Sequence, residues 1–381
     1  MPTQQQSTDF PKRVMFVIHS MRGGGSERQM SYLANEIASL AHTSLVTLDQ
    51  TGNDAYPLDS RIERIGLNLT GTSGGRLKGV VANIRRIRSL RGQIRIWRPD
   101  VVVSFCDSTN ILSLLACPSN IPMLISERSD PRHQTLGRIW EFMRKAYYPK
   151  CRICVAQTKE VGEHIVAQGW VARSKVVVIP SAIRIPDLNL ESLNRQRALI
   201  HPKTLIFVGR LSKEKRLDRL LNAWASLREH HSDWRLQIVG DGLERVPLQR
   251  LAAELNIDQT VQWSLWSEDV WSSLTAAHAY CLVSNYEGYP QSMLEAMASG
   301  LPVAVLDCSP AIRQTISDEV DGLVIPSEDF ISSTLHKMLS RNALRDALSR
   351  AAFQRARDFE WSAIAPQWLA AITTCKFEVS R

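Results

Sequence analysis

Short apolar segments alternate with helix-like segments along this chain, and the alternation runs through the chain twice. The first series starts at residues 13–18, and a second series starts at 204–209 after a polar stretch. Strands that alternate with helices indicate parallel βαβ units and doubly wound sheets. At 381 residues the chain is too long for one typical core. We therefore expect an α/β protein with two successive Rossmann-like domains, at residues 1–185 and 186–360, and a C-terminal helical segment at 361–381.

The apolar periodicity places the individual elements. Strands are predicted at 13–18, 43–48, 101–105, 121–125, 153–156, 176–179, 204–209, 235–239, 261–263, 279–283, 303–305 and 322–325. Helices are predicted at 26–40, 80–97, 215–228 and 361–374, and 187–200 is either a linker or a first helix.

A pair of glutamates lies eight positions apart around a predicted strand-to-helix loop. The apolar segment 280–284 predicts a buried strand, and 292–298 predicts a helix. Glu287 then lies on the loop and Glu295 about two turns into the helix. A loop that opens a helix presents free backbone N–H groups, which suit a phosphate. Beside a phosphate bound there, the carboxylate of Glu287 suits a sugar hydroxyl and that of Glu295 suits a ribose diol. The segment therefore predicts a sugar-nucleotide site.

A basic loop follows the strand at 204–209. Arg210 and Lys215 can both reach an anion bound where the next helix begins, whereas we expect Lys213 and Arg216 to be more solvated. A planar guanidinium and a compact ammonium together suit a diphosphate. A capped basic helix start is the structural alternative.

Three glycines, Gly23 to Gly25, follow the first strand and open the first helix. Glycines let a backbone approach a ligand closely. The loop is neither a dinucleotide fingerprint nor a P-loop, and by itself it is compatible with a tight turn.

Two acidic residues follow strands of the first half. Asp107 comes after 101–105, and Glu127 comes after 121–125. Residues at the carboxyl ends of parallel strands line the binding crevice. Either carboxylate can orient the hydroxyl of an acceptor, and either can equally be a helix N-cap.

The string E-G-Y-P-x-S-x-L-E-A-M-A-S-G-x-P-V, which begins at Glu287, resembles the donor-site motif of the retaining GT-B glycosyltransferases of family 4. The resemblance implies two Rossmann-like domains whose parallel sheets face a central cleft, with the end of the chain crossing back to the first domain. It also implies a nucleotide-sugar substrate, no cofactor, and front-face displacement in which the acceptor attacks the face that the diphosphate leaves.

The resemblance also assigns roles to single residues. Glu287 would hold hydroxyls of the donor sugar, and Glu295 the ribose. Arg210 and Lys215 match a G-R-L-x-x-x-K element and would neutralise the diphosphate in place of a metal, since the chain has no D-x-D motif. The remaining donor-site positions implied by the resemblance are Gly24 and Gly25 near the diphosphate, Gly242 and Trp263–Trp266 at the base, and Gly288, Ser292 and Met293 of the motif itself.

The segment S-E-R-x-D-P at 126–131 resembles a subgroup that builds bacterial surface polysaccharides and lipid-linked oligosaccharides, often from galactose or N-acetylgalactosamine donors. Many relatives have a histidine where Glu127 falls, which leaves open whether Glu127 does the work of that histidine. The implied reaction moves a hexose or N-acetylhexosamine from a nucleotide sugar, by analogy a UDP-sugar, to a lipid-linked or polysaccharide acceptor.

The first half is basic: residues 1–185 carry 25 Lys and Arg against 14 Asp and Glu, and the rest carries 21 against 24. An anionic partner is therefore expected. No acidic residue lies between Arg76 and Pro99, where an apolar stripe runs beside a stripe of arginines. The pattern fits a helix on an anionic membrane, and equally a helix packed on the sheet with a solvated basic edge. The arginines of the stripe are Arg88, Arg91, Arg95 and Arg98.

Other features narrow the class of protein. The sequence has no apolar run of about 20 residues and no signal-peptide core, so we expect a cytoplasmic protein, or a peripheral one on the inner face of the cytoplasmic membrane. The seven cysteines suit buried free thiols rather than a metal site. The alternatives are an epimerase or hydrolase of the same shape, an inactive scaffold, or, given a pI of about 9.2, a nucleic-acid-binding protein that lacks any recognised motif.

Overall fold

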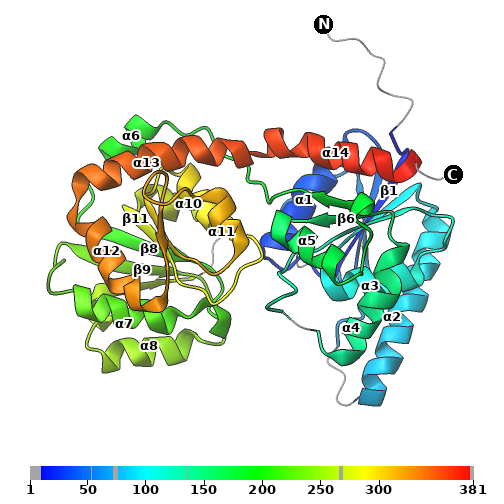
Figure 1. The fold of residues 1–381 in the computed structure, drawn as a ribbon, viewed down its shortest axis with the longest axis horizontal. Coiled ribbons are helices and arrows are strands. Elements are labelled where there is room, and N and C mark those ends of the chain that lie inside the picture. Colours follow the sequence, from blue (N-terminus) through cyan, green and yellow to red (C-terminus); the bar gives the residue numbers. More distant parts are fainter. Residues whose placement is uncertain (1–9, 53, 72–75, 135, 266–268, 378–381) are drawn as a thin grey trace, which may run out of the picture. The chain divides into compact units, whose positions relative to one another are not determined.

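The computed structural model describes residues 10–52, 54–71, 76–134, 136–265 and 269–377. The chain forms two compact units, Met1–Ser181 with Ile364–Arg381, and Ala182–Ala363. Each unit contains one sheet of parallel strands with helices packed on it, as Figure 1 shows. The expected α/β architecture is therefore confirmed.

The sheet of the first unit has the order β3-β2-β1-β4-β5-β6-β7, and every neighbouring pair is parallel. Strand order reverses between β1 and β4, which makes the carboxyl ends of these two strands the expected binding position. Strand β3 was not predicted, because Glu63 and Arg64 interrupt its apolar pattern. The strands are β1 (Arg13–Ile18), β2 (His42–Thr47), β3 (Ile62–Gly66), β4 (Val101–Phe105), β5 (Met123–Ser126), β6 (Ile153–Ala156) and β7 (Val176–Val178).

Alternate side chains of β1 face opposite sides of this sheet. Met15 and Val17 join a buried cluster with residues of α2, α3 and α5. Phe105 of β4 packs against Trp368 of α14, with ring centroids 5.4 Å apart. The helices of this unit are α1 (Gly25–Ala38), α2 (Arg76–Trp97), α3 (Asp107–Ala116), α4 (Arg138–Tyr147), α5 (Lys159–Ala167) and, from Ile364 onward, α14 (Trp361–Phe377).

The sheet of the second unit has the order β10-β9-β8-β11-β12-β13, again with all neighbours parallel. Its order reverses between β8 and β11. The strands are β8 (Lys203–Val208), β9 (Trp234–Val239), β10 (Val261–Ser264), β11 (Ala279–Leu282), β12 (Val303–Leu306) and β13 (Leu323–Ile325). The helices are α6 (Leu190–Arg197), α7 (Leu217–Leu227), α8 (Arg245–Glu254), α9 (Val270–Ala276), α10 (Gln291–Ala298), α11 (Pro310–Thr315), α12 (Ile331–Ser340) and α13 (Asn342–Ala356).

Helix α10 carries the glutamate motif, and its end is held by a buried arginine. Arg197 of α6 donates to the carbonyl oxygens of Ser299 at 2.6 Å and Gly300 at 3.2 Å. These carbonyls at the end of a helix need partners from outside it. Gly300 ends the helix in the left-handed region, with φ of 68°. Burial lowers the pKa of Arg197 to about 10.

Candidate active site

The loops after β8 and β11 meet where the strand order of the second unit reverses. The Lys215 Nζ donates to Glu287 Oε1 at 2.7 Å, and the Ser284 hydroxyl donates to the same oxygen at 2.7 Å. The backbone N–H of Asn285 also donates to the carbonyl oxygen of Glu214 at 2.8 Å. Glu287 is buried and Lys215 is partly exposed. The structure thus joins two residues that both belong to the predicted donor site.

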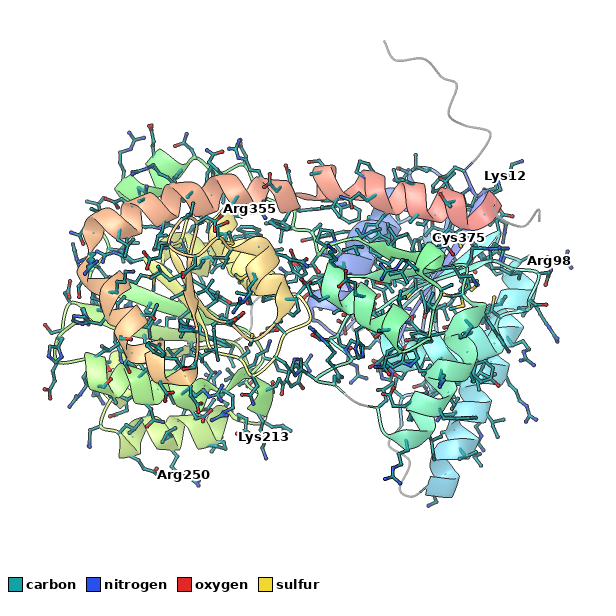
Figure 2. All side chains as sticks on the ribbon, in the orientation of Figure 1. Lys12, Arg98, Lys213, Arg250, Arg355 and Cys375 are labelled. Atoms are coloured by element: carbon teal, nitrogen blue, oxygen red, sulfur yellow. The ribbon has the colours of Figure 1, made fainter. Side chains whose placement is uncertain are left out.

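The basic loop differs in detail from its prediction. Residues Lys213–Lys215 form a short 3-10 turn, and α7 begins only at Leu217, because Arg216 adopts the left-handed conformation with φ of 46°. Arg210 and Lys213 are exposed, and Figure 2 shows Lys213 on the surface. Arg216 is partly exposed and pairs with Asp218 at 2.8 Å. Its side chain is 32% exposed against 20% for Lys215, so it is more solvated than Lys215, as expected, but not more than the exposed Arg210.

A third loop, after β9, lies against the basic loop through backbone contacts. The Gly209 N–H donates to the Val239 carbonyl oxygen at 3.0 Å, and the Leu211 N–H to that of Asp241 at 2.9 Å. A Cβ added at Gly242 would lie 2.2 Å from the carbonyl oxygen of Leu211. Only glycine permits this approach. The structure therefore places Gly242 beside the loop that carries Arg210 and Lys215.

The motif helix α10 begins at Gln291, one residue before the predicted helix. Glu295 therefore lies about one turn into the helix, and not two turns as predicted. Its side chain and that of Met293 are buried, whereas Gly288 and Ser292 are partly exposed. The Ser292 and Tyr280 hydroxyls are 2.8 Å apart.

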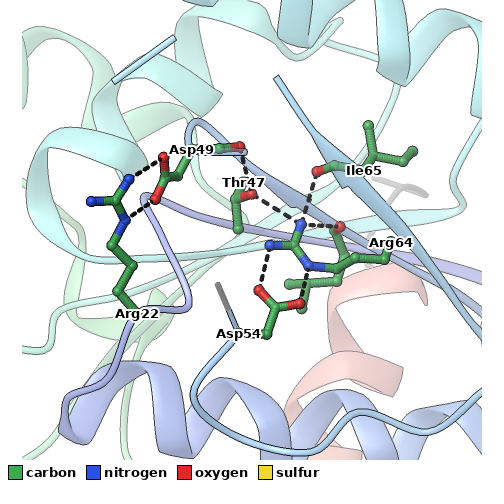
Figure 3. Close-up of polar contacts among 7 residues, drawn as sticks. Arg22, Thr47, Asp49, Asp54, Arg64 and Ile65 are labelled. Atoms are coloured by element: carbon green, nitrogen blue, oxygen red, sulfur yellow. Dashed lines mark hydrogen bonds and ion pairs between the residues drawn. The ribbon is translucent and has the colours of Figure 1, made fainter. Parts of the chain in front are cut away.

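The glycine loop of the first unit is held by a tyrosine hydroxyl and is preceded by an ion pair. Gly24 precedes α1 and Gly25 is its first residue. The Gly24 N–H donates to the Tyr56 hydroxyl at 3.1 Å. Earlier in the loop, Arg22 pairs with the buried carboxylate of Asp49, as Figure 3 shows. Its guanidinium holds the pKa of Asp49 below the ordinary range.

Hydrogen bonds connect Asp49, through Thr47, to Arg64 of β3. The Asp49 carbonyl accepts from the Thr47 hydroxyl at 3.0 Å, and Arg64 donates to that hydroxyl at 2.9 Å while pairing with Asp54 (Figure 3). The end of β2 is thereby braced by side chains from three segments.

The two predicted carboxylates of the first unit lie in one buried polar cluster. Glu127 Oε1 accepts from the Tyr148 hydroxyl and from Asn110 Nδ2, the latter at 3.4 Å. Arg144 of α4 lies 3.7 Å from Asp107 Oδ2 and donates to Glu141 at 3.1 Å. Glu127 does not cap a helix, and Asp107 is the first residue of α3 after Cys106 at the N-cap position.

Burial governs the electrostatics of this cluster. Burial raises the pKa of Glu127 to about 7, and Arg144 opposes the rise with its charge. A carboxyl group with this pKa can hold or release a proton near neutral pH. Loss of hydration likewise raises the pKa of the thiol of Cys106, a partly buried residue, to about 12, so this thiol is protonated.

Sequence reasoning missed three members of this cluster: Asn110, Arg144 and Tyr148. Each is fully buried, and each lies on an element other than the loop that carries Glu127. One signal was available. Arg144 follows Glu141 by three positions, a spacing that favours pairing if the segment is helical. The spacing does not indicate that Arg144 also interacts with Asp107 or Glu127.

Several other predictions concern parts of the molecule away from these loops. Trp263 lies in β10 and is partly exposed, while Trp266 lies outside the described residues. All seven cysteines are free thiols, four of them buried. Among the described residues, no three His, Cys, Asp or Glu side chains are arranged to hold a metal ion. No described helix combines the length and the apolar character needed to cross a membrane.

Helix α2 shows two different faces. Leu90, Ile94 and Trp97 are buried in the core of the first unit, so this part of the apolar stripe packs on the sheet. The four arginines of the predicted stripe are exposed. Arg91 is nevertheless engaged, because it donates to the carbonyl oxygen of Leu115 at 2.7 Å.

Two family models match the chain, one over each unit. The model described as Glycosyltransferase Family 4 matches residues 23–185. The model described as Glycosyl transferases group 1 matches residues 192–355. The matched regions contain the glycine loop and Glu127 in the first case, and Lys215, Glu287 and Glu295 in the second.

Similar proteins include enzymes of bacterial glycan synthesis. The chain is 26% identical over 368 residues to a Campylobacter jejuni enzyme described as GalNAc-alpha-(1->4)-GalNAc-alpha-(1->3)-diNAcBac-PP-undecaprenol alpha-1,4-N-acetyl-D-galactosaminyltransferase, covering 96% of this chain and 99% of the relative. It is 28% identical over 193 residues to the lipopolysaccharide 1,6-galactosyltransferase of Salmonella typhimurium, covering 49% and 52% of the two chains.

Solved structures share the fold. The glycosyltransferase WaaG matches with a TM-score of 0.75 at 19% identity, covering 94% of this chain and 99% of the other. The galactosyltransferase WaaB matches with a TM-score of 0.70 at 18% identity, over 94% and 99%. Anabaena HepE, solved with UDP and glucose, matches with a TM-score of 0.73 at 14% identity, over 94% and 99%. The fold is therefore GT-B, as predicted.

Proposed function

Because this chain belongs to the glycosyltransferases that join a family 4 domain to a group 1 domain, we propose that it transfers a hexose or N-acetylhexosamine with retention of configuration. The donor is a nucleotide sugar, specifically a UDP-sugar. The acceptor is a lipid-linked or polysaccharide glycan. One observation carries the donor site: Lys215 and Glu287 are hydrogen-bonded to each other where the strand order reverses, and the exposed Arg210 lies on the same loop as Lys215.

The geometry of the Lys215–Glu287 pair supports a separate role for each residue. Both Lys215 and Ser284 bond to Oε1 of Glu287, so Oε2 is the atom we assign to hydroxyls of the donor sugar. An ammonium group has three N–H donors, and one of them suffices for Glu287. The others, with the guanidinium of Arg210, are assigned to the diphosphate. Two cations offset its negative charge, which supports our proposal that no metal ion is required.

The other donor contacts are assigned by position. Gly242 lies in the loop that contacts the basic loop, and we assign its segment to the nucleotide. Gly288, Ser292 and Met293 lie at or just before the start of α10, where N–H groups suit phosphate oxygens. Glu295, one turn further, is assigned to the ribose. Gly24 and Gly25 at the start of α1 are assigned to the diphosphate in the same way.

The proposed chemical step is front-face displacement. The bond from C1 of the donor sugar to the diphosphate oxygen breaks as the bond from the acceptor oxygen to C1 forms on the same face. The leaving diphosphate oxygen takes the acceptor proton, so no separate base is needed. The chain's own residues then contribute positioning and charge stabilisation.

Asp107 and Glu127 are proposed to position the acceptor hydroxyl. Both lie after neighbouring strands of the first sheet, and both belong to one buried cluster. Glu127 is held from two sides by Tyr148 and Asn110, so its carboxylate is fixed in orientation. The pH dependence of turnover tests whether Glu127 replaces the histidine of many relatives.

The relatives support the biological setting. The Campylobacter relative is described as acting on an undecaprenol-linked glycan, and the Salmonella relative as a lipopolysaccharide galactosyltransferase. We propose synthesis of a bacterial surface glycan on the cytoplasmic side of the membrane, with the protein peripheral to an anionic membrane surface and without any specific nucleic-acid partner.

Calorimetric titration of UDP, GDP, UDP-sugars and NAD into the purified protein, with EDTA present, tests the donor assignment. UDP should bind without metal, binding should be lost in Lys215→Ala, and it should persist in Lys213→Ala, which removes an exposed lysine two residues away. If only GDP bound, the proposed donor would become a GDP-sugar. If none of these ligands bound, the donor-site assignment would be refuted. The anomeric configuration of the product, read by NMR, then tests retention.

A further inference from the structure

Two helices of the first unit expose large apolar side chains. Ile139 and Phe142 of α4 are 72% and 74% exposed. Val80, Val81 and Ile84 on the first half of α2 are also exposed. Fourteen large apolar side chains are exposed among the described residues, and these five fall on two short helical segments of one unit. Such a concentration marks an interaction surface.

Chain direction places the α4 part of this surface at the carboxyl edge of the sheet. Helix α4 runs from the carboxyl edge back to the start of β6 at the amino edge, and Arg144 of α4 already lies beside Asp107 at the carboxyl edge. Ile139 and Phe142 precede Arg144 in the helix. Ile139 and Phe142 therefore lie at the carboxyl edge of the sheet, at least as far from the amino edge as the cluster around Asp107 and Glu127.

The same reasoning applies to α2, which can be followed in Figure 1. Helix α2 has 22 residues and is about 33 Å long, whereas β4 spans only about 17 Å. Arg91 of α2 contacts the last turn of α3, at the amino edge. The first half of α2 thus reaches the carboxyl edge, where α3 begins at Asp107. Both α2 and α4 also contact α3.

The charge around these side chains is positive. Lys78, Arg85 and Arg88 are exposed on α2, and no acidic residue interrupts residues 76–99. Arg138 and Lys145 are exposed on α4, whose Glu141 pairs with the buried Arg144. Apolar side chains mixed with unopposed cations suit an anionic lipid surface, because the cations meet the head groups while the apolar groups enter the boundary of the acyl chains.

We propose that the exposed face of α2 and α4, defined by Val80, Val81, Ile84, Ile139 and Phe142 with their flanking cations, docks on an anionic phospholipid bilayer. The surface lies at the same sheet edge as Asp107 and Glu127, so docking brings a lipid-linked acceptor to these carboxylates. This proposal rests on the proposed function and names the surface by which the enzyme reaches its acceptor.

The proposal also selects among the arginines of α2. Arg91 is bonded to carbonyl oxygens of α3. Arg95 and Arg98 line a cavity with Arg13 and Trp97 at the far end of the helix, near the amino edge. Figure 2 shows Arg98 at that end. The cations of α2 assigned to lipid are therefore Lys78, Arg85 and Arg88, which join Arg138 and Lys145 of α4.

Vesicle flotation tests the surface with four proteins. These are the unaltered chain, Ile139→Glu with Phe142→Glu, Arg85→Glu with Arg88→Glu, and a control with Leu199→Glu and Val320→Glu. The control introduces two glutamates at exposed apolar positions of the second unit. The vesicles are phosphatidylcholine alone, or with about one third phosphatidylglycerol. Circular dichroism and UDP titration of each protein check folding and the donor site.

The unaltered chain and the control should float with anionic vesicles and not with neutral ones. Both face variants should lose about tenfold or more in partitioning, with UDP affinity kept. Equal loss in the control, or no binding of the unaltered chain, would overturn the docking surface. Self-association that only the face variants abolish would overturn it in favour of a second copy of the chain. Vesicle binding without UDP binding would instead refute the proposed function alone.

Discussion

The Lys215 ammonium group donates a 2.7 Å hydrogen bond to the Glu287 carboxylate, and this bond joins the loops that follow two neighbouring strands, β8 and β11. Seventy-two positions separate the two residues in the chain. The bond therefore fixes a cation and an anion at one point of the second unit, before any ligand is present.

Replacing either partner of this pair should impair turnover more than folding. Lys215→Ala removes the charge assigned to the leaving diphosphate, and we expect kcat to fall about 100-fold or more. Glu287→Gln keeps an oxygen that accepts from Lys215 and Ser284 but removes its charge, and should reduce kcat in the same direction. Steady-state kinetics beside thermal unfolding would measure both effects.

Lys213→Ala is the matched control for this prediction, since Lys213 is exposed on the same turn. The double variant Lys215→Ala with Glu287→Gln should be no worse than the poorer single variant, because the two groups act as a unit. Near-normal turnover in both single variants would contradict the donor-site assignment.

The buried Glu127 should make stability depend on pH. Its folded-state pKa of about 7 lies above the ordinary value of 4.5. A raised carboxyl pKa contributes stability that is fully present below about pH 4.5 and is lost as the pH rises through 7. Glu127→Gln cannot ionise, so the variant should gain up to about 3 kcal/mol relative to the natural chain between pH 5 and pH 8.

Urea unfolding of both proteins at several pH values would measure this gain. A difference in free energy of unfolding that stays constant from pH 5 to pH 8 would show that Glu127 does not titrate in this range. The pH profile of turnover on the acceptor should change in the same window if Glu127 positions the acceptor hydroxyl.

The charge of Arg144 should determine the pH range over which Glu127 affects stability. Its charge lowers the pKa of Glu127, against the larger effect of burial. Arg144→Met keeps a long apolar stem beside Trp170 and Tyr148 but removes the charge. The pKa of Glu127 should then rise further, and the pH-dependent loss of stability should move to higher pH.

The measurement compares each of two backgrounds, natural and Arg144→Met, with its own Glu127→Gln variant, so that the general cost of losing Arg144 cancels. A merely structural Arg144 would lower stability at every pH and leave the midpoint of the Glu127 effect unmoved.

Gly240 should tolerate no side chain, because its backbone lies against the basic loop. Its φ is 149°, and an added Cβ would lie 1.9 Å from the carbonyl oxygen of Gly209. Gly240→Ala must displace the backbone of one loop, so we expect a loss of about 3 kcal/mol or more together with weakened UDP binding.

Gly169→Ala separates backbone strain from this clash. Gly169 also has a positive φ, of 66°, but nothing lies within 4 Å of its added Cβ. We expect a cost of about 1 kcal/mol and unchanged UDP binding. Equal losses in the two variants, measured by thermal unfolding and calorimetry, would show that the close approach of the loops is unimportant.

The sequence alone was sufficient for the fold class and for most strand positions. Buried parallel strands are continuous apolar runs, so residues 101–105 and 153–156 were predicted as strands with the bounds that the structure has. Strand β3 was not predicted, because Glu63 and Arg64 break the apolar run. The helix of the glutamate motif was placed to within one residue, since its apolar spacing and closing glycine are local signals.

Only the tertiary structure decided which side chains meet. Parallel strands are joined by long crossovers, so nothing in the local pattern states that β8 lies beside β11 or β4 beside β5. That order brings Lys215 to Glu287 and sets Asn110, Tyr148 and Arg144 around Glu127 and Asp107. The sequence by itself determined the chemical groups available and the loops that carry them. Their burial and partners, and hence the raised pKa of Glu127, follow from contacts between distant segments, which exist only in the folded sheets.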